Sequence, residues 1–99
     1  MRVISLKHIR EAGKKFPESQ SALLAWHQII KHSHFSNFDD LRKTFNSVDK
    51  VGRCCVFNIG GNKLRLIAAI HFNTGIVYIR EILTHKEYDR GKWKPPCEE

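Results

Sequence analysis

Hydrophobic and polar positions near the start of the chain alternate with the period of an α-helix. Apolar residues recur every three or four positions between Leu6 and Phe16, after a short apolar segment at 1–5 that predicts an opening strand. Ser5 is a residue type that caps helices, and Pro17 cannot continue one. The pattern therefore predicts a strand over 1–5 and a capped helix that ends before Pro17.

Two further helices follow the same period. One begins near Ser19 or Ser21, and its apolar side consists of Leu23, Trp26, Ile29 and Ile30. The other spans 38–45, with Asn37 as its candidate cap, acidic residues in its first turn and basic residues in its last turn. Its apolar positions are Phe38, Leu41 and Phe45. We expect both apolar sides to be buried in the core.

The period changes to that of β-strands in the second half of the chain. Segments 54–59, 63–72 and 76–83 have the composition of strands, and Gly60-Gly61-Asn62 and Asn73-Thr74-Gly75 between them are turn signals. Together they predict an antiparallel meander that follows the helices. The expected fold class is α+β, a small antiparallel meander sheet with two to three helices packed on one face.

Positive charge is concentrated in the predicted sheet. The 99 residues include 17 Lys and Arg against 10 Asp and Glu, which gives a formal net charge of +7. From Lys50 to Arg80 there are five Lys or Arg and no acidic residue. A basic sheet face favours a polyanionic partner such as nucleic acid. A solvated face without a partner is the alternative that the charges alone leave open.

Alternation along segment 63–72 separates two faces of this strand. One face is apolar and is expected against the helices: Leu64, Leu66, Ala68, Ile70 and Phe72. The other carries Lys63, Arg65 and His71 beside Ile67 and Ala69. We therefore expect Arg65 to be an exposed charge on the face away from the helices.

The segment that closes the last predicted strand contains groups suited to RNA cleavage. His85 and Tyr88 are three residues apart, so one helical turn places them on a common side, and Arg80 precedes them. Metal-free cleavage needs a group that takes the proton of the ribose 2′-hydroxyl, a donor to the leaving oxygen, and cations at the phosphate. Histidine transfers protons near neutral pH, and tyrosine donates or stacks on a base. An ordinary surface histidine is the alternative.

The cysteines and the paired glycines carry weaker signals. Cys54 and Cys55 are neighbours on a strand, point to opposite faces and are poor disulfide partners for each other. With Cys97 and His32-x-His34 they match no zinc spacing, so we expect small core residues in a reduced, cytoplasmic protein. Gly60-Gly61 joins two strands and does not open a helix, which favours a turn over a phosphate loop. No apolar run approaches the roughly 20 residues of a membrane span.

Two separated motifs, in order, resemble a known family. They are Val56-Phe57-Asn58-Ile59-Gly60-Gly61-Asn62-Lys63-Leu64-Arg65-Leu66 and Thr84-His85-Lys86-Glu87-Tyr88-Asp89, with Tyr78-Ile79-Arg80 between them. Both are similar to the HigB toxins of type II toxin–antitoxin pairs. The resemblance implies a single RelE-like domain over 1–90. Residues 91–99 lie outside the motifs and are expected to form a flexible C-terminal tail, in which Trp93 either stacks on a base or docks on the core.

The resemblance also implies an activity and a set of partners. Members of the family are endoribonucleases that cut messenger RNA, often on translating ribosomes, without a metal or another cofactor. A HigA-type helix-turn-helix antitoxin neutralises them, and operator DNA is bound only through the toxin–antitoxin complex. No membrane partner is implied.

The family motifs carry these roles to particular residues of this chain. The catalytic candidates are Arg65 as phosphate clamp, His85 as proton-transfer group and Tyr88 as stacking or donor residue. The residues expected to bind RNA are Lys63, Arg80 and Lys86 within the motifs, and Lys50, Arg53 and Lys92 outside them. An exposed strand charge adds little stability, so we expect Arg65→Ala to impair cleavage more than folding.

Two other hypotheses stay open from the sequence. One is a non-catalytic RNA- or ribosome-binding module with the same basic face. The other is a transcriptional regulator that acts only through a protein partner. Replacing His85 separates the nuclease from the binding module, because binding survives in both and cleavage exists only in the first. A helix-turn-helix partner by itself does not separate the toxin from the regulator.

Overall fold

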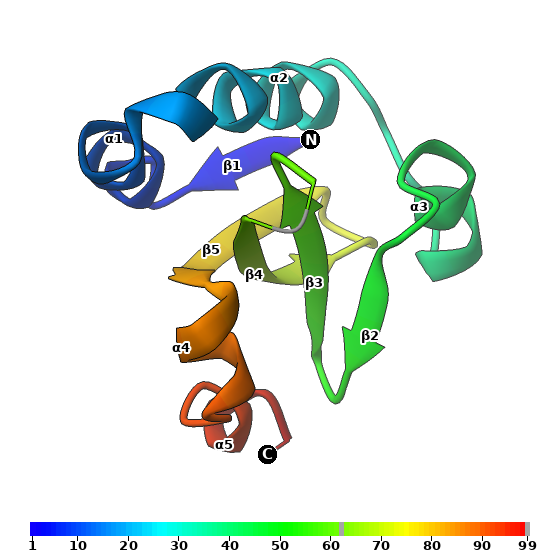
Figure 1. Ribbon diagram of the computed structural model, residues 1–99. Helices are drawn as coiled ribbons and strands as arrows, with labels where there is room; N and C mark the ends of the chain where they lie inside the picture. The colour runs from blue at the N-terminus through cyan, green and yellow to red at the C-terminus, as the bar shows by residue number, and fades with distance from the viewer. Residues whose placement is uncertain (62, 99) are drawn as a thin grey trace.

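Five strands form one mixed sheet in the order β1-β5-β4-β3-β2 (Figure 1). The strands are β1 (Arg2–Ile4), β2 (Asp49–Val51), β3 (Cys54–Ile59), β4 (Leu64–His71) and β5 (Ile76–Thr84). The pairs β2–β3, β3–β4 and β4–β5 are antiparallel, and β1 pairs in parallel with β5 at the edge. The α+β class and the meander are therefore confirmed, while β2 was not predicted from the sequence and β1 makes the sheet mixed. The computed structural model describes residues 1–61 and 63–98, so Asn62 of the predicted turn and Glu99 of the tail lie outside the described residues.

The helices occupy both ends of the chain and the segment before β2. They are α1 (Lys7–Lys15), α2 (Gln20–Lys31), α3 (Phe38–Thr44), α4 (His85–Asp89) and α5 (Lys94–Glu98), with a 3₁₀ turn at Pro17–Ser19. Figure 1 shows α1 and α2 together along one side of the sheet, α3 beside β2, and α4 and α5 below the end of β5. No helix in the described part of the chain is long and apolar enough to cross a membrane.

Local signals predicted one helix start correctly and another incorrectly. The side chain of Asn37 caps α3, because its Oδ1 accepts from the Asp40 N–H at 2.8 Å. Ser5 does not cap α1: its φ of 74° is in the left-handed region, and α1 begins after Leu6 without a side-chain cap. On α2, Ile29 is 40% exposed and not buried as predicted, because it is rotated by about 100° from the buried Ile30.

The main core lies between the sheet and the first three helices. Aromatic rings meet edge to face there: Phe57 of β3 lies 5.3 Å from Trp26 of α2 and 5.1 Å from Phe45, which follows α3. The apolar face of β4 packs into the same core through Leu64, Leu66, Ala68 and Ile70. The predicted alternation along β4 is therefore confirmed.

The opposite face of the sheet carries a second, smaller core. Trp93 and Cys97 of the C-terminal segment are 4% and 1% exposed and pack against Cys54, Val56 and Ile67 of β3 and β4. The flexible tail expected over 91–99 is thus not what the described residues 91–98 show, because Trp93 and Cys97 are buried against the sheet. The docking of Trp93 on a core is the alternative that the structure supports.

A disulfide attaches this tail to the sheet. Cys54 and Cys97 are bonded although 43 residues separate them in sequence. The nearby backbone N–H of Arg53 donates to the Cys97 carbonyl oxygen at 2.7 Å. The expectation of three reduced cysteines is therefore wrong for this pair, since only folding of the tail brings the two sulfurs together. Cys55 is free and buried, as expected, and its burial raises the pKa of the thiol to about 11.

Candidate active site

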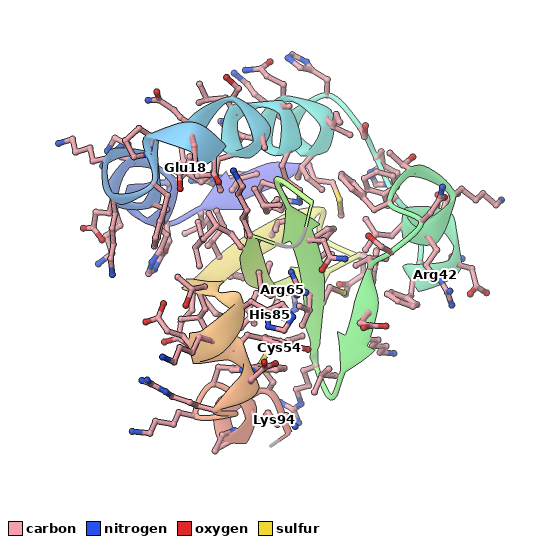
Figure 2. The ribbon with its side chains drawn as sticks, in the orientation of Figure 1. Glu18, Arg42, Cys54, Arg65, His85 and Lys94 are labelled. Atoms are coloured by element: carbon pink, nitrogen blue, oxygen red, sulfur yellow. A yellow bond between two sulfur atoms is a disulfide. The ribbon has the colours of Figure 1, made fainter. Side chains whose placement is uncertain are left out.

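The end of β5 positions the segment with the predicted proton-transfer groups. Thr84, the last residue of β5, pairs with Leu64 at the start of β4, and Leu83 pairs with Arg65. Helix α4 begins at the next residue, His85. The register therefore places His85 directly after the strand pair that contains Arg65, and Figure 2 labels both side chains in one region between α4 and the strands.

A capping box fixes where α4 starts. The Thr84 hydroxyl accepts from the Glu87 N–H at 3.2 Å, and the Glu87 carboxylate accepts from the Thr84 N–H at 3.0 Å. The Thr84 N–H and the Thr84 hydroxyl, which is 3.1 Å from the same carboxylate oxygen, hold the pKa of Glu87 below its ordinary value. The turn that carries His85 and Tyr88 is thereby set at a defined position relative to β5.

His85 has a carboxylate partner within the same helix. Its Nδ1 lies 2.9 Å from Oδ2 of Asp89, four residues later, and both side chains are exposed. A proton on Nδ1 donated to this carboxylate leaves Nε2 as an acceptor that faces solvent. This is the arrangement of a base oriented by a third group. Asp89 was missed as a site residue in the sequence, although His-x-x-x-Asp on a helix is the signal that marks the pair.

Tyr88 contacts Arg65 on the sheet and Trp93 in the tail. The guanidinium carbon of Arg65 is 5.7 Å from the centroid of the Tyr88 ring. The Tyr88 and Trp93 rings are stacked, with centroids 4.8 Å apart and planes 15° apart. The indole Nε1 of Trp93 also donates to the Tyr88 carbonyl oxygen at 2.9 Å. The tail therefore holds the Tyr88 ring in place over Arg65.

Arg65 is less accessible than its position on the strand predicts. The residue is 9% exposed, and its Nη1 donates to the Leu64 carbonyl oxygen at 3.3 Å. The expected exposed charge is thus wrong, because Tyr88 and the tail cover a face that the strand pattern alone leaves open. In this arrangement the guanidinium touches Tyr88 and is largely shielded from solvent.

The environment of Tyr88 favours the protonated phenol. Partial burial raises its pKa above the ordinary value, the negative charges of Asp49 and Asp89 raise it further, and Arg65 acts in the opposite direction. A phenol that keeps its proton is a donor and not a base at neutral pH.

The six cations expected to bind RNA are all exposed and fall into two groups. In the first group, Lys63 precedes β4, Lys86 lies in α4 and Lys92 lies between α4 and α5. The other three line one cavity at the far end of β4: Lys50, Arg53 and Arg80. The positive charge therefore extends along the sheet and is not confined to the surroundings of His85.

The fold and the site define a class of protein: a small α+β domain with a His–Asp pair at the end of its meander. Comparison with known proteins identifies the family. Residues 19–91 match the HigB toxin family, the RelE-like toxic component of a toxin-antitoxin system. This chain belongs to that family, which confirms the resemblance of its motifs. The match ends at Gly91, so the docked tail from Lys92 onward lies outside the region of the family match.

Curated relatives extend the likeness over nearly the whole chain. The mRNA interferase toxin HigB of Escherichia coli (strain K12) is 37% identical over 92 residues, which cover 90% of this chain and 88% of the relative. The mRNA interferase HigB of Shigella flexneri has the same identity and coverage. The mRNA interferase HigB of Escherichia coli O6:H1 is 32% identical over 93 residues, or 91% of this chain and 90% of the relative.

Proposed function

We propose that this toxin-family chain is an endoribonuclease that cleaves messenger RNA by proton transfer through His85. Membership of the HigB toxin family and the names of its relatives, mRNA interferases, support the class of reaction. The observation that carries the proposal is the contact of 2.9 Å between His85 Nδ1 and Asp89 Oδ2. It leaves Nε2 of an exposed imidazole free to act on a substrate.

The proposed reaction uses the 2′-hydroxyl of the RNA itself as nucleophile. Nε2 of His85 takes the proton of this hydroxyl, the 2′-oxygen bonds to the adjacent phosphorus, and the bond from phosphorus to the 5′-oxygen breaks. Tyr88 donates its phenolic proton to the leaving 5′-oxygen. The products are a 2′,3′-cyclic phosphate and a 5′-hydroxyl. His85 then releases its proton to solvent, and Tyr88 takes a proton from solvent.

The cation on α4 and the cation on the sheet have different roles in this proposal. Lys86 is exposed beside His85 and supplies positive charge at the pentacoordinate phosphate. Arg65 is a positioning residue in this proposal, because its guanidinium is covered and touches the Tyr88 ring. The direct phosphate clamp expected of Arg65 is therefore replaced by a role through Tyr88.

We further propose that cleavage takes place on translating ribosomes in the cytoplasm and that a HigA-type antitoxin blocks it. The net charge of +7 supports association with ribosomal RNA as well as messenger RNA. Binding of the antitoxin gives the pair its access to operator DNA, through the helix-turn-helix of the antitoxin and not through this chain.

The test is cleavage of a defined messenger RNA by the purified chain, with and without translating ribosomes. We expect His85→Ala to lower the cleavage rate by about 100-fold or more, the range of a lost general base. His34→Ala is the matched control, because it removes an exposed histidine outside α4. Equal loss in both variants, or no loss in either, contradicts the assignment of His85. RNA binding by the folded wild type without cleavage in either condition favours the non-catalytic binding module.

A further inference from the structure

A basic cavity of about 410 Å³ lies at the end of β4 opposite to His85. Its chemically distinctive lining consists of Lys50, Arg53, Arg80, His71, Phe38 and Phe72. Among the described residues that line this cavity there is no Asp or Glu. Three cations and a histidine around one hollow favour an anionic ligand, and the two aromatic rings add apolar surface.

Arg80 lines this cavity and lies at a β-bulge. Ile67 pairs with Glu81 and Ala68 pairs with Ile79, so Arg80 is the extra residue of β5 and has no partner on β4. Bulges of this kind redirect a side chain next to functional sites. Val77 and Ile79 are buried in the main core, so alternation along β5 puts Tyr78 and Arg80 on the open face, and Arg80 lies there without a partner on β4.

Arg80 also connects this cavity to its neighbours. It lines a second cavity of about 410 Å³ together with His71 and Tyr78. It lines a third, of about 220 Å³, together with Lys92 and Trp93 of the tail. The three cavities therefore meet at Arg80, between the turn from β2 to β3 and the tail that packs on Tyr88.

The cavity is too far from His85 to bind the phosphate that is cleaved. Lys50 and Arg80 of the cavity lie at the level of Ala68, because Lys50 pairs with Cys55, Cys55 pairs with Ala68, and Arg80 bulges between the partners of Ile67 and Ala68. Leu64, which pairs with Thr84 next to His85, is four residues from Ala68 on β4, which corresponds to about 13 Å. A nucleotide in the cavity is therefore a different nucleotide of the RNA from the one at the broken bond.

We propose that this cavity is a second RNA-binding subsite, which holds a backbone phosphate between Lys50, Arg53 and Arg80 and a base against Phe38. The Cζ atom of Arg42 lies 6.0 Å from the Phe38 ring, which adds a further cation at the rim. This inference rests on the proposed function in that RNA is the ligand. It goes beyond that function by giving the RNA a second contact with the protein, away from the bond that is cleaved.

Oligonucleotide length tests the subsite. The probes are 2′-O-methyl RNAs of three and twelve nucleotides, which His85 cannot cleave because the nucleophilic hydroxyl is blocked. We expect Lys50→Gln/Arg53→Gln to weaken binding of the longer probe at least tenfold and to leave the shorter one unchanged. The slope of log K against log salt for the longer probe falls by about 0.7, since the single-strand phosphate contact held in the cavity is lost.

A charge-matched variant separates the subsite from a general loss of positive charge. Lys7→Gln/Lys14→Gln removes two exposed lysines from α1, neither of which lines the cavity. We expect this variant to bind both probes nearly as the wild type does. Equal weakening by the two double variants, or weakening of the short probe by Lys50→Gln/Arg53→Gln, overturns the subsite.

Binding of a mononucleotide tests whether the cavity recognises the phosphate, the nucleoside or both together. We expect adenosine monophosphate to shift the NMR signals of His71 and Phe72 more than inorganic phosphate or adenosine does alone. Phe38→Leu, which keeps an apolar side chain and removes the ring, reduces the affinity for the mononucleotide about five-fold or more. Unchanged His71 and Phe72 signals with the mononucleotide overturn the proposal.

The same set of proteins distinguishes failure of the subsite from failure of the nuclease. If His85→Ala abolishes cleavage and Lys50→Gln/Arg53→Gln binds the long probe normally, the subsite falls and the nuclease stands. If the double variant loses affinity for the long probe and His85→Ala cleaves like the wild type, the subsite stands and the assignment of His85 falls.

Discussion

Asp89 accepts a hydrogen bond from Nδ1 of His85 at 2.9 Å, one helical turn away on α4. The helix itself sets this distance, because residues four apart lie on the same side. The capping box of Thr84 and Glu87 sets where the turn begins. The position of the imidazole therefore depends on a few neighbouring residues, all within the segment that follows β5.

Asp89 is expected to assist His85 without taking part in the chemistry. Asp89→Asn keeps the size of the side chain and removes the negative charge that stabilises the imidazolium formed during proton transfer. We expect the single-turnover cleavage rate to fall by about tenfold or more, less than for His85→Ala. Asp39→Asn, which removes an exposed acid from α3, is the control. A wild-type rate for Asp89→Asn contradicts the orienting role.

Tyr88 gives a prediction at alkaline pH. Because the folded state raises the pKa of this phenol, chiefly through burial, its contribution to stability is present below the ordinary value of 10.0 and is lost as the pH rises through the raised value. We expect the free energy of unfolding of the wild type to fall more steeply above pH 10 than that of Tyr88→Phe. Parallel curves from chemical denaturation would show that Tyr88 does not titrate differently in the two states.

Arg65 is expected to matter for stability as well as for cleavage. Arg65→Ala removes a shielded guanidinium and its contact with the Tyr88 ring, which should cost about 1–2 kcal/mol of unfolding free energy. Lys63→Ala, at an exposed position two residues earlier, should change stability by no more than about 0.5 kcal/mol. Urea denaturation measures both values.

A positioning role for Arg65 has its own signature in the rate. Arg65→Lys keeps a positive charge without the planar guanidinium that lies near the Tyr88 ring. We expect it to lower the cleavage rate at saturating RNA and to leave the KM for RNA nearly unchanged. A raised KM with an unchanged maximal rate indicates instead that Arg65 binds the phosphate directly.

The bond from Cys54 to Cys97 is expected to stabilise the docked tail. Cys97→Ser should lower the unfolding free energy by about 2–4 kcal/mol, since the bond closes a loop of 43 residues. The oxidised wild type should fall to a similar stability when dithiothreitol is added, and the variant should not respond. Equal stability of the wild type with and without dithiothreitol contradicts a stabilising role for this disulfide.

Features governed by near neighbours in the chain were predictable from the sequence. The alternation of Leu64, Arg65 and Leu66 assigned the two faces of β4 correctly, since successive side chains of a strand point to opposite sides. The cap at Asn37 and the turn shared by His85 and Tyr88 depend on residues three or four positions away. Helical and strand periods, turns and caps are therefore encoded within short segments.

Contacts between distant segments were decided only by the tertiary structure. Arg65 is covered because Tyr88 and Trp93 fold back over its strand, and the strand pattern contains no information about what lies above an exposed-looking face. The bulge at Arg80 depends on how β4 and β5 align, which neither strand specifies by itself.

The sequence by itself thus determined the α+β class, the helix and strand periods and the pairing of a basic sheet with a His-Tyr turn. The tertiary structure decided that the tail docks on the open face, that Cys54 reaches Cys97, and that three cations share one cavity. The physical reason is the range of the interactions: local periodicity is set by backbone geometry over a few residues. Burial and cavities are set by packing between segments that come together only when the whole chain has folded.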